Sequence, residues 1–222
     1  LLGLVPLFSM NLQRIGFGRS SWEGADEGMG FLDSFRAVIL SRNVFLLSVL
    51  RIAYSFTNAF FLTIFAVYAS TELGLDSSLI AILFGVKGLL NMVSRIPSGR
   101  LADRIGAKKP LLFAFATLIL VYLMIAEGKD IRLLAVAMAL FGAVHGMRAV
   151  VEGSSLGGNV PPAAIGIATA YLSTMFNVGG ALGSVACGIL TTATTYQNIF
   201  RLAALIIAVG PVAALLIKEN AR

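Results

Sequence analysis

Residues 99–110 have the sequence Gly-Arg-Leu-Ala-Asp-Arg-Ile-Gly-Ala-Lys-Lys-Pro, a short segment that carries five charged side chains. Apolar runs at about 79–98 and 111–126 lie directly before and after it. An apolar helix of about 20 residues is long enough to cross a bilayer, whereas charged residues are costly inside the hydrocarbon core. The stretch therefore predicts a polar loop that joins two transmembrane helices.

Apolar runs recur along the rest of the chain, at about 44–69, 131–150, 163–190 and 198–217. With a rise of about 1.5 Å per residue, most helices of this length reach across the roughly 30 Å of hydrocarbon. The run at 111–126 is the shortest, and its helix is expected to include a few flanking residues. Because the connections are short, consecutive helices are expected to be antiparallel neighbours. The sequence thus predicts an all-α membrane protein with six transmembrane helices.

The composition excludes several classes of protein. Hydrophobic residues make up 58% of the chain and charged residues 13%, about half the charged share of a soluble domain. The net charge of +6 does not indicate nucleic-acid binding, because the basic residues lie in short loops between apolar runs. One cysteine, Cys187, and one histidine, His145, are too few for a disulfide framework or a zinc-type metal site. The sequence contains no phosphate-binding loop and no set of catalytic side chains, so neither an enzyme nor a cofactor is expected.

Lysine and arginine residues outside the apolar runs gather on one side of the predicted membrane. Eleven of them fall on the side that also holds both ends of the chain: Arg14, Arg19, Arg36, Arg42, Arg100, Arg104, Lys108, Lys109, Arg148, Lys218 and Arg222. Three fall on the other side: Lys129, Arg132 and Arg201. Since cytoplasmic loops carry an excess of basic residues, the first side is expected to be cytoplasmic. We therefore expect a multi-pass protein of the cell membrane with both ends in the cytoplasm.

The stretch at 99–110 resembles the signature loop of the major facilitator superfamily, G-x-x-x-D-R-x-G-x-K/R-K/R. Every defined position is filled, by Gly99, Asp103, Arg104, Gly106, Lys108 and Lys109. The loop also follows the second of six apolar runs, which is its place in one half of such a transporter. The resemblance implies one half of a two-half bundle, built of 3+3 helices, that carries a solute by alternating access.

Residues 34–43 resemble the segment that links the two halves of these transporters, so the chain is expected to hold a C-terminal half. In that interpretation residues 1–8 are the end of a truncated transmembrane helix, 9–42 form the cytoplasmic inter-half loop, and 43–222 form the six-helix transmembrane transporter domain. Within the loop, residues 31–40 are expected to form a short amphipathic helix on the membrane surface. An N-terminal half would carry the same signature loop, so it stays an alternative.

Individual residues of the signature loop have separate physical roles. Gly99 is expected to let its helix approach a neighbour closely, and Gly106 to adopt the positive φ of a tight turn. Lys108 and Lys109 are expected mainly to enforce membrane topology. Asp103 adds nothing to that effect, so a gating role at a helix end is favoured for it.

Arg148 and Glu152 lie one helical turn apart at the end of the fourth apolar run, where an i,i+4 pair forms readily. In the family, charges at this place join the signature loop in a cytoplasmic latch. The resemblance therefore implies that Asp103 reaches Arg148, and Arg104 reaches Glu152, in the outward-open state. A simple pair of Arg148 with Glu152 is the alternative.

Three ionisable side chains stand out inside predicted spans, where such groups are costly and usually face a cavity or a partner. Lys87 lies about eight residues, or roughly 12 Å, into its span, and no acidic residue occurs at that depth. It is a candidate for substrate binding or coupling, and a structural pair with the other half is the alternative. Arg51 and His145 are further candidates. Snorkelling to the interface is favoured for Arg51, and hydrogen-bonded packing for His145.

The expected function is secondary active transport of a small solute, with an anionic or polar metabolite preferred because Lys87 and Arg51 are basic. A multidrug or metabolite efflux carrier of the same superfamily is one alternative. A non-transporting membrane scaffold or receptor is an alternative of another class. The expected partners of such a permease are a small-molecule substrate, a coupling proton or ion, the lipid bilayer and the missing N-terminal half. No cofactor, metal or nucleic acid is expected.

Overall fold

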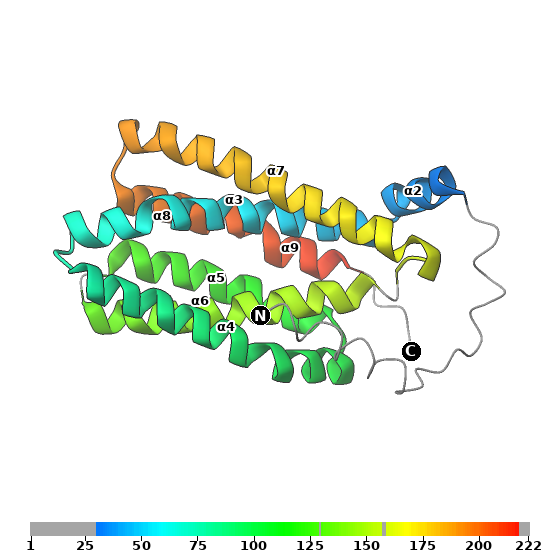
Figure 1. Ribbon diagram of the computed structural model, residues 1–222, viewed down its shortest axis with the longest axis horizontal. Helices are drawn as coiled ribbons and strands as arrows, with labels where there is room; N and C mark the ends of the chain where they lie inside the picture. Colours follow the sequence, from blue (N-terminus) through cyan, green and yellow to red (C-terminus); the bar gives the residue numbers. More distant parts are fainter. Residues whose placement is uncertain (1–29, 129, 157–158, 218–222) are drawn as a thin grey trace, which may run out of the picture.

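The computed structural model describes residues 30–128, 130–156 and 159–217 (Figure 1). Helices are the regular elements of this part: α2 (Phe31–Leu40), α3 (Arg42–Thr71), α4 (Ser77–Ile105), α5 (Lys108–Glu127), α6 (Ile131–Leu156), the 3-10 turn η1 (Pro162–Ala164), α7 (Ile165–Ala193), α8 (Tyr196–Ile207) and α9 (Val209–Leu216). Six segments of this part are long and apolar enough to cross a membrane, with α8 and α9 forming one of them. The predicted six-helix membrane fold is confirmed. The truncated helix expected at 1–8 and the loop at 9–29 lie outside the described residues.

The helix limits differ from the apolar runs in ways that local chemistry explains. α5 has 20 residues, because it begins at Lys108 and so includes residues that flank the apolar run at 111–126. The sequence predicts this extension, since the run alone is short for a membrane span. The last segment breaks at Ala208, between α8 and α9. Pro211 has no N–H group to donate to the carbonyl of Ile207, so a continuous helix would lose that hydrogen bond.

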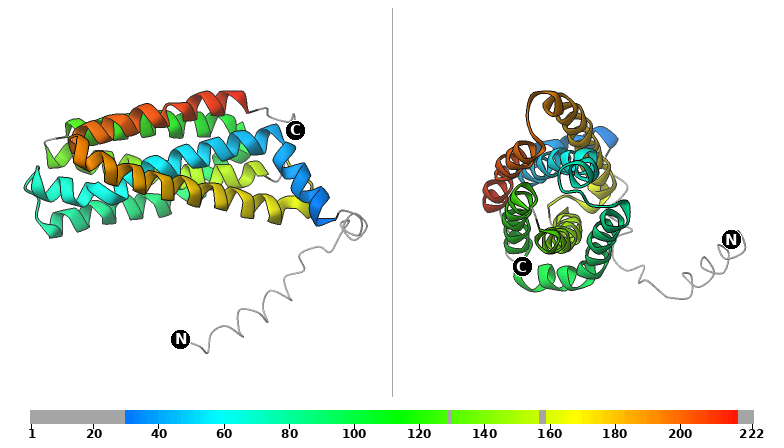
Figure 2. Two further views of the ribbon diagram at one scale, coloured as in Figure 1. Left: turned by 90° about the horizontal axis from the view of Figure 1, so that it is seen from above. Right: turned by 90° about the vertical axis from the view of Figure 1, so that its left-hand side faces the viewer.

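The membrane-spanning segments alternate in direction and run along the long axis of the bundle (Figure 1, Figure 2). One end of the bundle holds α2, the end of α4 and the start of α5 (Figure 1). We call it the basic end. The opposite end holds the end of α3, the end of α5 and the start of α8. Consecutive helices are therefore antiparallel, as the short connections predict.

Two helix pairs approach each other closely, α4 with α6 and α3 with α7. Gly142 of α6 lies against the backbone of Lys87, and Gly183 of α7 lies against the backbone of Phe56. A Cβ atom at either glycine would overlap the neighbouring backbone, so both crossings depend on glycine. Small residues at helix crossings are typical of membrane bundles, where close packing replaces the hydrophobic effect.

Burial differs strongly between the helices. In their membrane-spanning windows α3 has 67% of its residues buried, whereas α4 has 11% and α7 has 17%. The buried core is built largely from α3, α5 and α6, with side chains such as Phe60, Leu118 and Phe141. α4 and α7 consequently present apolar faces that need to be covered by lipid or by further protein.

α2 lies at the basic end and packs against α3, α7 and η1 (Figure 1). Ser34 and Val38 are buried in these contacts, whereas Leu32 is 77% exposed. The bounds of α2 are those predicted at 31–40, so the short helix is confirmed. Its placement on a membrane surface stays a prediction.

Candidate functional site

Glu152 is the acidic centre of a polar cluster between α3 and α6. Its side chain has no exposed surface, and it accepts hydrogen bonds from Nε of Arg51 at 2.9 Å and from Nη1 of Arg148 at 2.6 Å. The i,i+4 pair of Arg148 with Glu152, which the sequence offers as the alternative to the latch, is present in the structure. The sequence favours an Arg51 that snorkels to the interface, but the structure turns Arg51 towards Glu152 instead. Only the tertiary fold brings that carboxylate within its reach.

Tyr54 links this ion pair to His145. The guanidinium carbon of Arg148 lies 3.7 Å from the centroid of the Tyr54 ring, a cation–π contact that holds the charge in place. The Tyr54 hydroxyl shares a hydrogen bond with Nδ1 of His145, which fits the packing role favoured for that histidine. Nε of Arg148 is buried and has no hydrogen-bond partner among the described residues. A donor of the cluster is thus left unsatisfied.

Lys87 lies between aromatic rings of two other helices. Its Nζ atom is 4.4 Å from the ring centroids of both Phe61 in α3 and Phe141 in α6. Ring faces attract a cation electrostatically and so replace part of the hydration that the ammonium group loses. The structure therefore accounts for a lysine at this depth without an acidic neighbour. The sequence gives no sign of the two phenylalanines, because apolar residues fill every span.

A further basic residue, Arg95, lies on α4 about two turns beyond Lys87 and is absent from the candidates expected from the sequence. Its Nε is 3.4 Å from Oδ1 of Asn91. The positive charge of Arg95 acts on His145. The charges of Lys87 and Arg148 act on it too. The regular spacing of Lys87, Asn91 and Arg95 is the sequence signal that could have revealed it.

The polar loop predicted at 99–110 is mostly helical, because residues 99–105 continue α4 and residues 108–110 begin α5. Only Gly106 and Ala107 connect the two helices at the basic end. Gly106 has a φ of 82°, so the positive φ predicted for it is confirmed. A Cβ atom at Gly99 would meet the Val150 side chain at 3.5 Å, which is an ordinary contact. The close approach expected at Gly99 is therefore not present in this structure. Lys108 and Lys109 begin α5.

The residues from 47 to 222 match a family model described as Major Facilitator Superfamily. The chain belongs to the major facilitator superfamily. Members of this superfamily are transporters, so the protein is a multi-pass membrane protein that carries small molecules. The six membrane-spanning segments of its described part fit a fragment of the superfamily's bundle, consistent with one half of it. A comparison with curated proteins gave no match.

The latch that the superfamily implies has a different charge arrangement in this structure. Asp103 and Arg104 are exposed in the last turns of α4. The Glu152 carboxylate is bonded through one oxygen to Arg148 and through the other to Arg51. Glu152 is therefore paired with Arg51 and Arg148 in this structure, and not with Arg104. The latch that the resemblance implies for the outward-open state stays a prediction.

We call the group of Arg51, Lys87, Arg95, His145 and Arg148, with the acid Glu152, the basic cluster. The charge balance of this cluster defines what the site can do chemically. Four lysine and arginine charges stand against one carboxylate, an excess that is costly inside a membrane protein unless further negative charge offsets it. Such a site favours anions through charge-assisted hydrogen bonds. The described part of the chain holds no group of three potential metal ligands.

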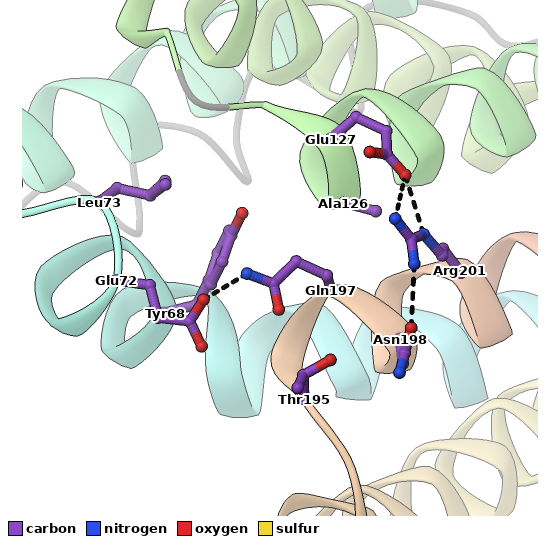
Figure 3. A pocket seen from close by; sticks show the side chains of 9 residues that line it. All are labelled: Tyr68, Glu72, Leu73, Ala126, Glu127, Thr195, Gln197, Asn198 and Arg201. Atoms are coloured by element: carbon purple, nitrogen blue, oxygen red, sulfur yellow. Dashed lines mark hydrogen bonds and ion pairs between the residues drawn. The ribbon is translucent and has the colours of Figure 1, made fainter.

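A second polar site lies at the opposite end, where α3, α5 and α8 meet around a pocket of about 650 Å³ (Figure 3). Arg201 donates two hydrogen bonds to one oxygen of Glu127, at 2.8 and 2.6 Å, and a third to Asn198 at 3.1 Å. Gln197 donates to Glu72 across the same pocket. These contacts tie three helix ends together. Because their charged groups are exposed and already paired, the pocket is a weaker candidate for substrate binding than the basic cluster.

Proposed function

We propose that this superfamily member is a secondary active transporter, and that the chain is the C-terminal half that helps to bind a small anionic or polar metabolite. In this proposal two six-helix halves rock about a site near the middle of the membrane and expose it to each side in turn. The poorly buried faces of α4 and α7 support it, because a second half would cover them. The gradient of a proton or another ion supplies the energy.

The observation that carries the anionic preference is the excess positive charge of the basic cluster. Glu152 is shared by two arginines, so it offsets one charge only. Lys87 has ring faces as neighbours, and Nε of Arg148 has no partner among the described residues. A substrate with a carboxylate or phosphate group would supply both the missing charge and the missing acceptors.

We further propose that the basic end faces the cytoplasm in the cell membrane. The basic loop at 106–109 lies at this end together with α2, whereas the acids Glu72 and Glu127 lie at the other end. An excess of lysine and arginine in cytoplasmic loops supports this orientation. The exposed leucines of α2 would then lie in the headgroup region of the inner leaflet.

Transport into proteoliposomes that contain the full-length protein tests the proposal. Uptake of radiolabelled succinate, citrate, inorganic phosphate and glucose 6-phosphate is compared with uptake of uncharged glucose, with and without an imposed proton gradient. We expect at least one of the anions to accumulate. Lys87→Ala is expected to reduce its uptake about tenfold, the effect of losing one modest charge contact. Arg132→Ala is the matched control, because Arg132 is exposed at the opposite end of the bundle.

Each other outcome points to a different function. Uptake that Lys87→Ala leaves unchanged would remove the basis of the anionic preference. Transport of apolar drugs or organic cations in place of anions would favour the efflux carrier. A well-folded full-length protein that moves no solute would favour a membrane scaffold or receptor.

A further inference from the structure

We propose that Arg95, oriented by Asn91, is a second anion-binding residue of the transport site and contacts the carboxylate or phosphate group of the substrate. This inference rests on the anionic substrate proposed above and deepens it. It adds a residue that the signature loop does not indicate. It also adds a directional contact that the ammonium group of Lys87 does not provide.

The placement of Asn91 connects Arg95 to the basic cluster. Lys87, Asn91 and Arg95 are spaced four residues apart, so they lie on one face of α4. The backbone and side-chain oxygens of Asn91 both stand next to Gly146, at the crossing of α4 with α6. The line of three polar residues therefore follows the contact with α6. Arg95 lies about 12 Å along the helix from Lys87, towards the basic end.

The guanidinium group of Arg95 is oriented by that asparagine. Its Nε lies 3.4 Å from Oδ1 of Asn91, at the long limit of a hydrogen bond. The structure shows no hydrogen bond for either Nη group within the described part of the chain, so both are left to donate to a ligand. The charge of Arg95 acts on His145, whose Nδ1 is already bonded to Tyr54. Arg95 thus belongs to the same electrostatic environment as the rest of the cluster.

The chemistry of Arg95 complements that of Lys87. Within the part of the chain that the structure describes, Arg95 is exposed and its hydrogen bond is to neutral Asn91, not to an acid. An arginine fork binds two oxygens of one carboxylate or phosphate, whereas a lysine acts as a point charge. The Nζ atom of Lys87 lies against the rings of Phe61 and Phe141, and the residue is only partly buried. Lys87 therefore supplies charge at depth, and Arg95 supplies the bidentate contact.

Equilibrium binding to the full-length protein in detergent tests this assignment. The probes are radiolabelled succinate and radiolabelled inorganic phosphate, which separate a carboxylate from a phosphate preference, with uncharged succinamide as the competitor. Arg95→Gln is expected to raise the Kd of the preferred anion about 10- to 100-fold, the effect of losing a charge-assisted hydrogen bond. The concentration of succinamide needed to displace the bound anion should be the same in the variant and in the unsubstituted protein. Arg95→Lys is expected to restore part of the affinity, because the charge returns without the fork.

A second variant keeps the test decisive if Arg95→Gln does not fold. Asn91→Asp retains Arg95 but places a carboxylate beside it, so the guanidinium group forms an internal ion pair. We expect the Kd of the anion to rise by a similar factor while the protein remains folded. Arg132→Gln is the matched control and is expected to bind like the unsubstituted protein.

The outcomes separate this inference from the proposed function. If Lys87→Ala weakens anion binding but Arg95→Gln and Asn91→Asp leave the Kd unchanged, the role of Arg95 is overturned and the anion transporter stands. That result would arise if Arg95 contacts a lipid phosphate or an acid of the other half. If the full-length protein neither binds succinate or phosphate nor transports any of the anions tested, both proposals fall.

Discussion

Arg148 and Glu152 form an ion pair of 2.6 Å in which both side chains are buried inside the bundle. Arg51 of α3 adds a second bond to the same carboxylate at 2.9 Å. The first bond lies within α6, whereas the second joins α6 to α3. Removing one partner of a buried ion pair is far more costly than the net stability that the pair provides, because the remaining charge stays buried. The cluster therefore makes the relative placement of these two helices sensitive to single charges.

Glu152→Gln removes the counter-charge of two arginines while keeping the shape of the side chain. We expect a loss of about 3–5 kcal/mol in the stability of the purified full-length protein. The measurement is thermal unfolding in detergent. Glu127→Gln is the control, because the pair of Glu127 with Arg201 is about half exposed and is expected to contribute less than about 1 kcal/mol. Equal losses in the two variants would contradict a special role for the buried pair.

Lys87→Met is expected to separate stability from transport. Methionine fills a similar volume and packs well against the rings of Phe61 and Phe141, while the cost of a charge at this depth disappears. The melting temperature should rise, and anion uptake should fall at least tenfold. Both are measured on the same protein preparation. A lower melting temperature would indicate that the lysine is a structural cation paired with another part of the transporter.

Gly183→Ala is expected to disturb the contact of α7 with α3, because the new Cβ would overlap the backbone of Phe56. Overpacking of this kind costs about 1–3 kcal/mol. Gly188→Ala, on the same helix, has open space around the new methyl group and should leave stability unchanged or slightly higher. Unfolding temperatures of the two variants provide the comparison. Indistinguishable values would mean that α7 does not pack on α3 in the way described.

The double variant Asp103→Asn, Arg104→Gln tests the signature loop without disturbing the fold. Both side chains are exposed in this structure, so stability should change by less than about 1 kcal/mol. A gating role nevertheless requires slower transport, and we expect initial uptake rates to fall severalfold. Rates and melting temperatures are measured together. Normal initial uptake rates would indicate that these two charges affect only the orientation of the protein in the membrane.

Structural features that depend only on residues close together in the sequence were predictable from the sequence. The apolar length of each segment predicts a membrane-spanning helix. Gly106 adopts the positive φ that the signature loop requires of it. Arg148 and Glu152 pair because four residues make one helical turn. The break at Ala208 also follows from local chemistry, since Pro211 cannot continue the hydrogen bonding of the helix.

By itself, the sequence determined the number and approximate positions of the membrane helices, the short helix α2 and the motif that marks the superfamily. Only the tertiary structure decided that Arg51 meets Glu152, that the rings of Phe61 and Phe141 contact Lys87, and that Arg95 contacts Asn91. The physical reason lies in the helices themselves. A membrane helix is apolar on almost every side, so no polar stripe marks which face turns inward. The partners of its few charged residues are therefore fixed by helix packing, at glycines such as Gly142 and Gly183.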